Sequence, residues 1–493
     1  MRARRILMVT SEAVPFAKTG GLGDVAGALP LALARLGHDV TVVLPRYRGP
    51  QAGTLVERLP ITIAGRTFDV AFVEHAMADR VRAILVDCPE LYDRPELYGI
   101  GNSDYPDNPV RFALLARAAL EYGARGDQGP DVVHAHDWQA GLALVYLKTL
   151  FKDRSGLSGA AGVFTIHNLS YQGLFPPGWM PALDLGWELF GIEGIEYWGK
   201  MSLLKGGINF SEIITTVSPR YAKEIQTPEF GFGFDGILRR RGKQLCGILN
   251  GIDVAVWNPE HDPYLPKPYG PNTLAAKDAS RRALLDTLGL PLTPDVLARP
   301  IVGMVSRMVV QKGFDLLADL ADELLTLDAT FVLLGSGEAR YQTLWQGLSD
   351  RAPDRVGVRF GFDERLAHLI EGGADIFLMP SRFEPCGLNQ MYSLKYGTVP
   401  VVRAVGGLDD TIDNWNPRTN SGTGFKFRDY TPEALRSSLE KALALFRKPK
   451  SWRAVQRAGM AKDYSWDASA AEYVSVYEKA ITLRRMGNRT ASV

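Results

Sequence analysis

The stretch Lys18-Thr-Gly-Gly-Leu-Gly-Asp-Val25 decides how this sequence folds. It follows a short apolar run, Ile6–Thr10, and leads into a helical pattern. A strand, a glycine-rich turn and a helix in this order predict the first unit of a parallel α/β sheet. Glycines let the backbone approach a ligand closely, and free N–H groups at a helix start bind phosphate or sugar hydroxyl groups. Lys18 adds a full positive charge beside them.

Two interpretations of this turn stay open, a structural turn and a site for the phosphate of a nucleotide sugar. The spacing fits neither G-x-G-x-x-G nor G-x-x-x-x-G-K-[ST], the two common nucleotide-binding loops. A dehydrogenase of the Rossmann type is disfavoured for a related reason. It would need the first of these motifs after a strand, with an acidic residue about 20 positions further on.

Length and composition indicate a globular protein of more than one domain. A chain of 493 residues exceeds a single hydrophobic core, and two domains of about 200–250 residues are expected. With 56 basic and 55 acidic residues the net charge is +1, so no overall field favours nucleic acid or an anionic membrane. The three cysteines lack a C-x-x-C pattern, which favours a reducing compartment. The apolar run after the N-terminal arginines is too short for a signal-peptide core, and no run approaches the length of a membrane span, so we expect the cytoplasm.

Short apolar runs alternate with helical patterns along the chain, which predicts parallel sheets with helices on both faces. The expected strands are Val40–Leu44, Val81–Val86, Asp131–His134, Gly162–Ile166, Ile213–Val217, Ile301–Val305, Thr330–Leu334, Val356–Phe360, Ile376–Met379 and Val399–Arg403. A proline-rich stretch, Asn258–Pro300, predicts the linker and the start of a second domain. After Ser465 an amphipathic helix is expected, which either closes the second domain or crosses back to the first.

Two polar motifs end strands in the first half. In His134-Ala-His-Asp-Trp138, alternation places both histidines on one sheet face, but no further ligand cluster supports a metal site. Asp137 is either a hydroxyl or sugar contact or the N-cap of the next helix. In Thr165-Ile-His-Asn-Leu169, His167 is either a ligand residue or a structural one.

Three further motifs end strands in the second half. In Ser306–Gly313 the cations Arg307 and Lys312 can converge on one polyanion. In Ser381–Gln390, Glu384 precedes a helix start whose amides, Cys386–Leu388, could hold a diphosphate, although Cys386 could equally be a packing residue. Gly406–Thr411 supplies another glycine turn. Each motif alone is weak, but together they predict a ligand site at the carboxyl ends of the strands.

In their order along the chain, the motifs resemble those of bacterial glycogen synthases and plant starch synthases. The matching segments are KTGGLGDV (18–25), HDW (136–138), HN (167–168), NGID (250–253), SRMVVQKG (306–313), SRFEPCGL (381–388) and GGLDDT (406–411). The resemblance implies an α/β fold with two Rossmann-like domains facing across a cleft, the GT-B architecture. It places the N-terminal domain at 1–257 and the nucleotide-sugar-binding domain at 258–464. A helix in 465–493 would cross back to the first domain, and the polar stretch Gly487–Val493 is expected to fray.

The resemblance also implies roles for individual residues. The expected catalytic residues are Glu384, Arg307, Lys312, His167 and Asp137. The expected ADP-glucose contacts are Lys18, Gly21, Asp24, Asn250, Phe362, Cys386, Gly387, Leu388 and Thr411. Within these sets Arg307 and Lys312 would clamp the diphosphate, Phe362 would stack on adenine, and Glu384 would be the essential carboxylate near the transferred sugar.

One position departs from the wider group of retaining transferases. Many of them carry a second glutamate eight residues after the first, where this chain has Tyr392. Glycogen synthases of the ADP-glucose type share this difference, so Tyr392 points to that subgroup of the retaining transferases.

The implied activity is transfer of glucose from ADP-glucose to the non-reducing end of an α-1,4-glucan, with retention of configuration. The expected acceptor is glycogen or a maltooligosaccharide, and no metal or cofactor is expected. Two alternatives stay open: another retaining transferase of the same architecture, with a different donor or a small acceptor, and a non-catalytic nucleotide-sugar or glucan-binding protein. The presence of Glu384, Arg307 and Lys312 argues against the second.

Overall fold

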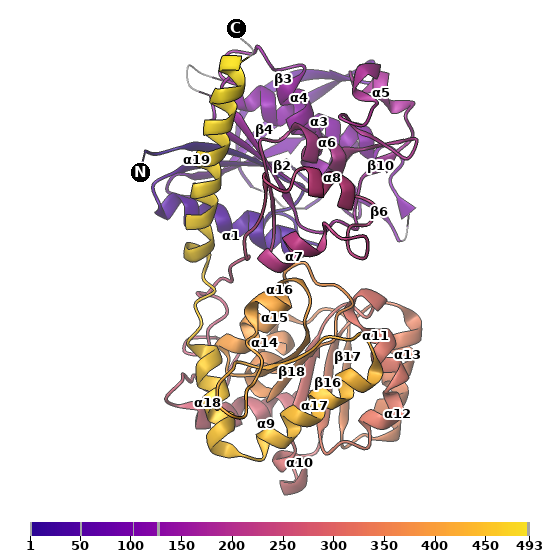
Figure 1. Cartoon of the computed structure of the whole chain (residues 1–493), viewed down its shortest axis with the longest axis vertical. Coiled ribbons are helices and arrows are strands. Elements are labelled where there is room, and N and C mark those ends of the chain that lie inside the picture. Colours follow the sequence, from indigo (N-terminus) through magenta and orange to yellow (C-terminus); the bar gives the residue numbers. More distant parts are fainter. Residues whose placement is uncertain (1, 50–51, 102, 126–128, 491–493) are drawn as a thin grey trace. The chain divides into compact units, whose positions relative to one another are not determined.

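The protein divides into two compact units, seen in a computed structural model that describes residues 2–49, 52–101, 103–125 and 129–490 (Figure 1). Unit 1 comprises the described residues of Met1–Val217, Ala222–Gly251 and Trp466–Val493, and unit 2 those of Ser218–Tyr221 and Ile252–Ser465. The chain therefore changes unit at 217/218, 221/222, 251/252 and 465/466, and the expected boundaries were 257/258 and 464/465.

Unit 1 is built on a nine-stranded sheet, counted over the described residues, in the order β14-β13-β9-β8-β1-β2-β5-β4-β3. Seven of these strands are parallel. They are β1 (Arg5–Val9), β2 (Asp39–Pro45), β5 (Val81–Asp87), β8 (Val132–His136), β9 (Ala161–Ile166), β13 (Ile213–Thr216) and β14 (Leu245–Gly247). The expected first-half strands are confirmed, because each is a short run of apolar residues buried on both faces.

The edge of this sheet differs from the all-parallel prediction. Strands β3 (Thr54–Ile63) and β4 (Arg66–Ala78) form an antiparallel hairpin, and β4 pairs antiparallel with β5. Most of β3 is exposed, and only its last residues are buried. An antiparallel edge can face water on one side, so these residues show no continuous apolar run.

The helices of unit 1 surround the sheet and include the last helix of the chain. They are α1 (Gly21–Arg35), α2 (Pro89–Tyr92), α3 (Asn108–Gly123), α4 (Asp137–Lys148), α5 (Trp179–Ala182), η1 (Trp187–Leu189), α6 (Leu203–Phe210), α8 (Asp235–Arg240) and α19 (Trp466–Thr490), and α7 (Pro219–Glu224) spans the change of unit. Small antiparallel pairs join β6 (Gly99–Ile100) to β7 (Ser103–Asp104), and β12 (Lys200–Ser202) to both β10 (Leu174–Phe175) and β11 (Glu196–Tyr197).

Helix α19 confirms the expected return to the first domain (Figure 1). Its apolar residues join the core formed by α1 and the strands β1, β2, β8 and β9. Tyr473, Val474, Tyr477 and Ile481 are all buried, as their spacing predicts. The helix runs through Thr490, so the tail expected to fray from 487 is helical to 490, and 491–493 lie outside the described residues.

Unit 2 contains a parallel six-stranded sheet, again counted over the described residues, in the order β17-β16-β15-β18-β19-β20. The strands are β15 (Ile301–Val305), β16 (Thr330–Gly335), β17 (Val356–Phe360), β18 (Ile376–Met379), β19 (Val399–Arg403) and β20 (Phe425–Phe427). The helices are η2 (Leu274–Ala276), α9 (Lys277–Thr287), α10 (Pro294–Ala298), η3 (Val310–Lys312), α11 (Phe314–Asp319), α12 (Ala321–Leu324), α13 (Ala339–Arg351), α14 (Glu364–Gly373), α15 (Asn389–Lys395), α16 (Gly406–Thr411), α17 (Pro432–Phe446) and α18 (Pro449–Met460).

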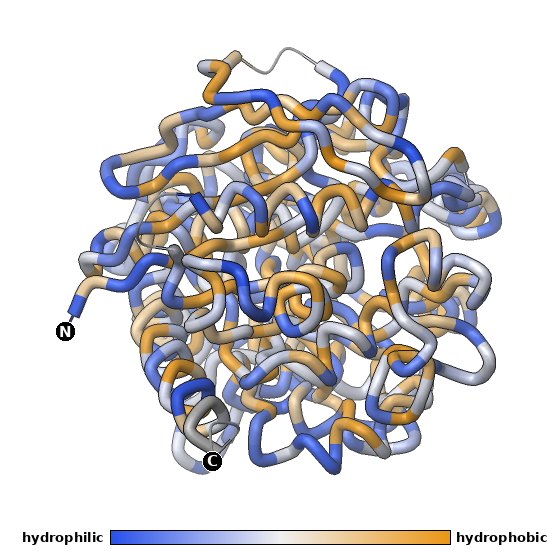
Figure 2. Tube along the Cα trace, turned by 90° about the horizontal axis from the view of Figure 1, so that it is seen from above, coloured by the Kyte–Doolittle hydropathy of each residue, from blue (hydrophilic) through white to orange (hydrophobic). Residues whose placement is uncertain are grey.

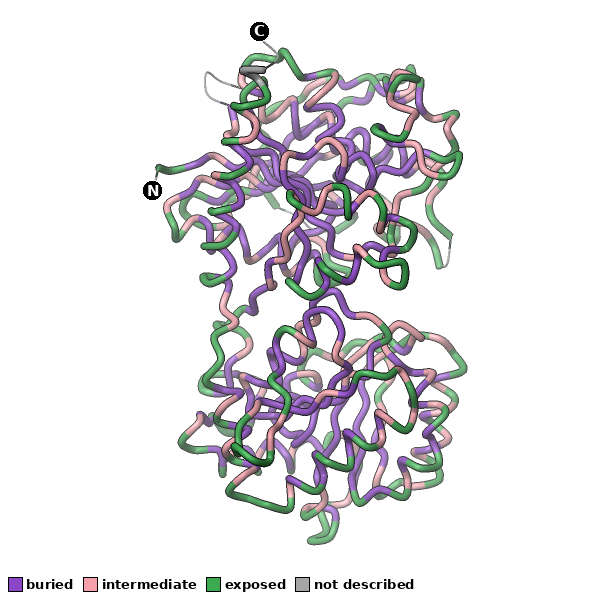
Figure 3. Tube along the Cα trace, in the orientation of Figure 1, coloured by how far each residue is buried: buried purple, intermediate pink, exposed green. Residues whose placement is uncertain are grey.

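Each unit has its own hydrophobic core around its sheet. Hydrophobic and hydrophilic stretches alternate along the trace (Figure 2). The parallel strands of both sheets are mostly buried, and exposed residues gather in the outer loops (Figure 3). Among the described residues, no helix combines the length and the apolar character that a membrane span needs.

Candidate functional site

The site in unit 2 lies where the strand order of the sheet reverses. Strands β15 and β18 are neighbours, but the chain proceeds from β15 to β16 and β17 on one side and from β18 to β19 and β20 on the other. In open α/β sheets, ligands bind outside the carboxyl ends of the strands at such a switch point. The loops that leave these two strands are 306–313 and 380–388, which carry the predicted cations and the predicted carboxylate.

Lys312 and Glu384 meet directly across this switch point. The Lys312 Nζ atom lies 2.5 Å from Glu384 Oε2, and the Ser381 hydroxyl donates to the same oxygen at 3.0 Å. The Glu384 side chain is 6 % exposed and that of Lys312 20 %. A pair this well shielded from water has a strong mutual attraction, and the structure thus brings these two predicted residues together.

Glycines allow the surrounding loops to approach so closely. A Cβ atom on Gly313 (φ +81°) would lie 2.1 Å from the Pro380 carbonyl oxygen, and one on Gly406 (φ +44°) 1.8 Å from that of Glu384. Both contacts are far shorter than any side chain tolerates. The 306–313, 380–388 and 406–411 segments are therefore packed backbone against backbone.

Two of the predicted donor contacts, Cys386 and Thr411, are buried side chains. Cys386 is buried, as the packing interpretation requires. Thr411 is also buried, and its hydroxyl donates to the Gly407 carbonyl at 2.6 Å. Gly387 has a φ of +73° and directly precedes Leu388 and α15, where backbone N–H groups lack helical acceptors.

Two predicted residues lie apart from the Lys312–Glu384 pair. Arg307 is exposed on the 306–313 loop, and its guanidinium makes no ion pair with any described residue. Phe362 is 90 % exposed and follows β17, at the edge of the sheet. An aromatic ring so fully exposed contributes little to the core.

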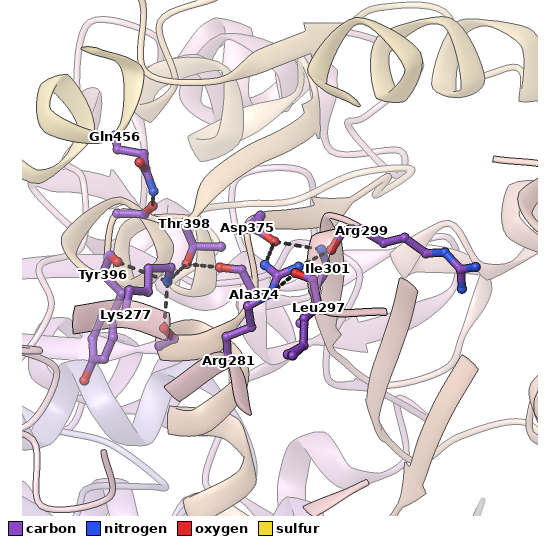
Figure 4. A network of polar contacts seen from close by, with 12 residues as sticks. Lys277, Arg281, Leu297, Arg299, Ile301, Ala374, Asp375, Tyr396, Thr398 and Gln456 are labelled. Carbon is purple, nitrogen blue, oxygen red and sulfur yellow. Dashed lines mark hydrogen bonds and ion pairs between the residues drawn. The ribbon is translucent and has the colours of Figure 1, made fainter. Parts of the chain in front are cut away.

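Helix α15, which follows the Glu384 loop, is anchored at its other end by Lys277 (Figure 4). The Lys277 ammonium donates to the carbonyl of Gly372 at 2.8 Å, to that of Tyr396 at 3.3 Å and to the Thr398 hydroxyl at 2.7 Å. Gly372 and Tyr396 lie at the ends of α14 and α15, so one cation meets the negative ends of two helix dipoles. Burial lowers the pKa of Lys277 to about 7. The sequence pattern did not reveal this residue, because its partners are carbonyl groups.

In unit 1, the predicted residues follow strands β1, β8, β9 and β14. Lys18 Nζ lies 2.6 Å from Asp24 Oδ1, so the loop after β1 and the first turn of α1 are joined by an ion pair. Burial raises the pKa of Asp24, and the nearby Lys18 charge opposes that rise. Gly21 is the exposed first residue of α1.

Glu12 is a functional candidate that the sequence analysis missed. Its carboxylate accepts hydrogen bonds from the Thr19 N–H at 2.5 Å, from the Thr19 hydroxyl at 2.6 Å and from the Gly20 N–H at 3.3 Å. It is 3 % exposed and therefore holds the glycine-rich turn in place from beneath. The available signal was an acidic residue directly after a strand, shortly before the turn.

Two histidines of β8 and the histidine directly after β9 are packed together. The His134 and His136 rings lie 4.1 Å apart, which confirms that they share a sheet face, and His136 Nδ1 lies 2.9 Å from His167 Nε2. Burial lowers the pKa of His134 and His167 to about 3. His134 is already bonded to Tyr477 and Thr165. No group of three metal-ligand side chains occurs in the described part of the chain.

Asp137 is held at the end of β8 by the neighbouring loop. It begins α4 with a φ of +56°, and His136 occupies the N-cap position, so the N-cap interpretation is wrong. Its carboxylate instead accepts the His167 N–H at 2.7 Å, which brings these two predicted residues together. Burial raises the pKa of Asp137 to about 7.

Asn250 lies beyond β14 with an unused hydrogen-bonding group. The residue is 5 % exposed, and its Oδ1 atom is buried without a hydrogen-bond partner among the described residues, as is Nε2 of His136. Buried polar atoms are almost always bonded. A bound ligand would therefore supply the hydrogen-bond partners that Asn250 Oδ1 and His136 Nε2 lack among the described residues.

Known proteins match this chain along its whole length. Residues 5–240 match the starch synthase catalytic domain family, and residues 295–458 match glycosyl transferases group 1. The glycogen synthase of Koribacter versatilis is 48% identical over 482 residues, which cover 97% of this chain and 99% of that protein. The glycogen synthase of Anaeromyxobacter dehalogenans strain 2CP-1 is 49% identical, with 96% and 98% covered.

Solved structures agree with this assignment. The catalytic domain of starch synthase IV from Arabidopsis thaliana, bound to ADP and acarbose, superimposes with a TM-score of 0.89 at 31% identity and covers 98% of this chain and 100% of that chain. A sucrose-phosphate synthase from Thermosynechococcus elongatus, with a TM-score of 0.59 and 17% identity over 97% and 99% of the two chains, shares the fold. The chain therefore belongs to the glycogen and starch synthase family of glycosyltransferases.

Proposed function

We propose that this protein transfers glucose from ADP-glucose to the non-reducing end of an α-1,4-glucan, with retention at the anomeric carbon. The observation that carries the proposal is the Lys312–Glu384 contact at the switch point of the unit 2 sheet. The donor assignment is supported by the relatives named glycogen synthase and by the ADP bound to the Arabidopsis starch synthase IV domain.

The reaction breaks the bond between the anomeric carbon and the diphosphate oxygen. Positive charge then builds on the sugar and negative charge on the leaving ADP. In our proposal Arg307, Lys312 and the N–H groups of Gly387 and Leu388 stabilise the leaving diphosphate, while Glu384 faces the positive sugar. Fixed charges aimed at developing charge provide much of the rate enhancement in enzymes.

Retention follows most simply from attack on the same face that the diphosphate leaves. Retaining glycosidases use a second carboxylate as nucleophile, but the motifs of this chain supply only Glu384 for that part of the site. We therefore propose a short-lived, oxocarbenium-like intermediate, with the leaving phosphate accepting the proton of the acceptor hydroxyl. The proposed reaction uses no metal or other cofactor, because cationic side chains and amides neutralise the diphosphate.

The first unit is proposed to contact the glucose of the same donor. Asp137, His167 and Asn250 supply polar groups for its hydroxyls, of which the Asn250 Oδ1 atom lacks a protein partner among the described residues. Lys18, Gly21 and Asp24 form the donor-facing turn. The acceptor is glycogen or a maltooligosaccharide, with no role for nucleic acid or membrane. Cys88, Cys246 and Cys386 form no disulfide with any described residue, which fits the reducing cytoplasm.

Arg307→Ala tests the anion clamp without disturbing the fold. Arg307 is exposed, so we expect the free energy of unfolding to change by less than about 0.5 kcal/mol. Turnover with ADP-glucose and glycogen should fall at least tenfold, and by about 10²–10³ if Arg307 acts like other preorganised donors. The measurement is ADP release at saturating donor. Unchanged turnover would remove Arg307 from the mechanism.

Arg418→Ala is a matched control. Arg418 is another exposed arginine of unit 2, in the segment between α16 and β20, and belongs to none of the predicted motifs. We expect its replacement to leave ADP release within about twofold of the parent protein, since isolated surface substitutions have small effects.

A further inference from the structure

Trp198 is exposed at the tip of a hairpin whose geometry disfavours it. Strands β11 and β12 pair with Tyr197 opposite Lys200, so Trp198 and Gly199 form a two-residue turn. Their φ angles are +50° and +76°, the conformation for which Asn-Gly is the preferred sequence. A bulky side chain at positive φ is an outlier, yet the Trp198 ring is 84 % exposed and gains little from burial.

A second exposed aromatic residue, Phe232, stands beside this turn in the same unusual conformation. Its φ is +47°, and it is 38 % exposed. The Tyr197 hydroxyl and the Gln172 side-chain amide both donate to the Phe232 carbonyl, each at 2.9 Å. The Tyr197 ring stacks on Phe234 with the ring centres 4.3 Å apart. Two strained turns from distant parts of the sequence are therefore fastened to each other.

Tyr171 extends this group toward the predicted sugar site. It neighbours Gln172, is 52 % exposed and donates its N–H to the Asn168 carbonyl at 3.2 Å, in the loop that begins at His167. We call Tyr171, Trp198 and Phe232 the aromatic surface. All three belong to unit 1.

The strained residues of this surface are exposed to solvent. Backbone strain persists where the surrounding structure enforces it, and it marks functional positions. Neither Trp198 nor Phe232 fills the core, so folding alone does not explain their conformation. Rigid aromatic rings beside an amide and a hydroxyl suit a ligand with apolar faces and hydroxyl edges, and a pyranose ring has both.

Building on the function proposed above, we infer that the aromatic surface binds glucose units of the acceptor glucan beyond its reacting end. An acceptor glucan is the expected ligand because the aromatic surface adjoins the loop that begins at His167, a residue of the predicted sugar site. A chain whose end lies at His167 can continue along the 167–173 loop to Tyr171 and then to Trp198. Successive sugar rings would stack on these side chains, which would keep a long glucan bound between transfers.

Trp198→Asn separates binding from folding. Asn-Gly is the best sequence for this turn, so the variant should melt at the same temperature as the parent protein or higher. Its dissociation constant for glycogen, measured by affinity electrophoresis in the absence of donor, should rise about fivefold, the loss expected for one aromatic stacking contact. Trp198→Phe should recover most of the affinity.

Trp187→Ala is the matched control. Trp187 is another exposed tryptophan of unit 1, 56 % exposed, but it lies in the short helix η1 and not at the β11–β12 turn. Its replacement should leave glycogen binding within twofold of the parent protein.

Three results would overturn the inference. The first is glycogen binding by Trp198→Asn equal to that of the parent protein. The second is loss of affinity together with a lower melting temperature, which would assign Trp198 a structural role. The third is a difference in molecular mass between Trp198→Asn and the parent protein in light scattering, which would show that the surface forms a contact between copies of the chain. Glycogen binding needs no donor, so failure of the parent protein to use ADP-glucose would refute the proposed function while leaving this test readable.

Discussion

At Asp137, the conformation and the burial of a single residue both act against the stability of the free protein. The residue has a φ of +56°, and burial raises its pKa to about 7 from an ordinary value of 3.8. The unfolded chain therefore loses this proton near pH 4, whereas the folded chain keeps it to about pH 7. Between these values the folded state binds more protons, so rising pH lowers stability by up to about 1.4 kcal/mol per pH unit.

Asp137→Asn should therefore stabilise the protein while reducing its activity. Asparagine carries no charge, tolerates positive φ and can still accept the His167 N–H. We expect its advantage in unfolding free energy over the parent protein to grow from pH 5 to pH 7, reaching about 1–3 kcal/mol, and then to level off. Urea denaturation at several pH values measures this. Turnover should fall at least tenfold. A loss of stability that is the same at every pH would contradict the account.

Single residues were predictable from the sequence where a motif exposes a charged group. Lys312 and Glu384 stand out as charges at strand ends, and the structure brings them together. Glu12 and Lys277 could not be found in this way, because their partners include backbone groups, which carry no sequence signal. Such partners appear only once the fold has placed them.

At the scale of elements, α19 is the part of the chain whose packing is most consequential. It begins at Trp466, and its apolar face completes the core of unit 1. The Tyr477 hydroxyl also reaches His134 at 2.9 Å. A helix of this kind is stabilised mainly by the core that it covers.

Tyr477→Ala should accordingly destabilise unit 1. Tyr477 is 1 % exposed, and removal of a buried aromatic side chain costs about 3–5 kcal/mol. Ser475→Ala, on the exposed side of the same helix, should cost less than about 0.5 kcal/mol. Chemical denaturation of both variants gives the comparison. Equal stability of the two variants would mean that α19 does not complete the core.

The sequence predicted the strands well where they are buried on both faces and poorly where they are not. Strands such as β9 and β16 are continuous apolar runs bounded by polar residues. The β3–β4 hairpin mixes exposed and buried positions, so its apolar signal is weaker. Its turn, Ala64-Gly65, also lacks the residues that usually announce a hairpin.

At the scale of the whole molecule, two sheets of Rossmann type carry the predicted site residues in the loops and helices that follow their strands. Lys18, Asp137, His167 and Asn250 belong to unit 1, and Arg307, Lys312 and Glu384 to unit 2. The resemblance predicted both sheets and the returning helix. It could not predict Glu12, the Lys277 anchor or the strained aromatic turns, which depend on contacts specific to the folded chain.

Transfer of radiolabelled glucose from ADP-glucose to glycogen tests the central claim most directly, with UDP-glucose as the comparison donor and Glu384→Gln as the comparison protein. We predict that the parent protein places label in the glucan, with one ADP released per glucose, and that an exo-acting enzyme specific for α-1,4 linkages releases the label again. UDP-glucose should serve less well, and Glu384→Gln should give almost no transfer. No label in the glucan, label as free glucose only, or full activity of Glu384→Gln would contradict the account.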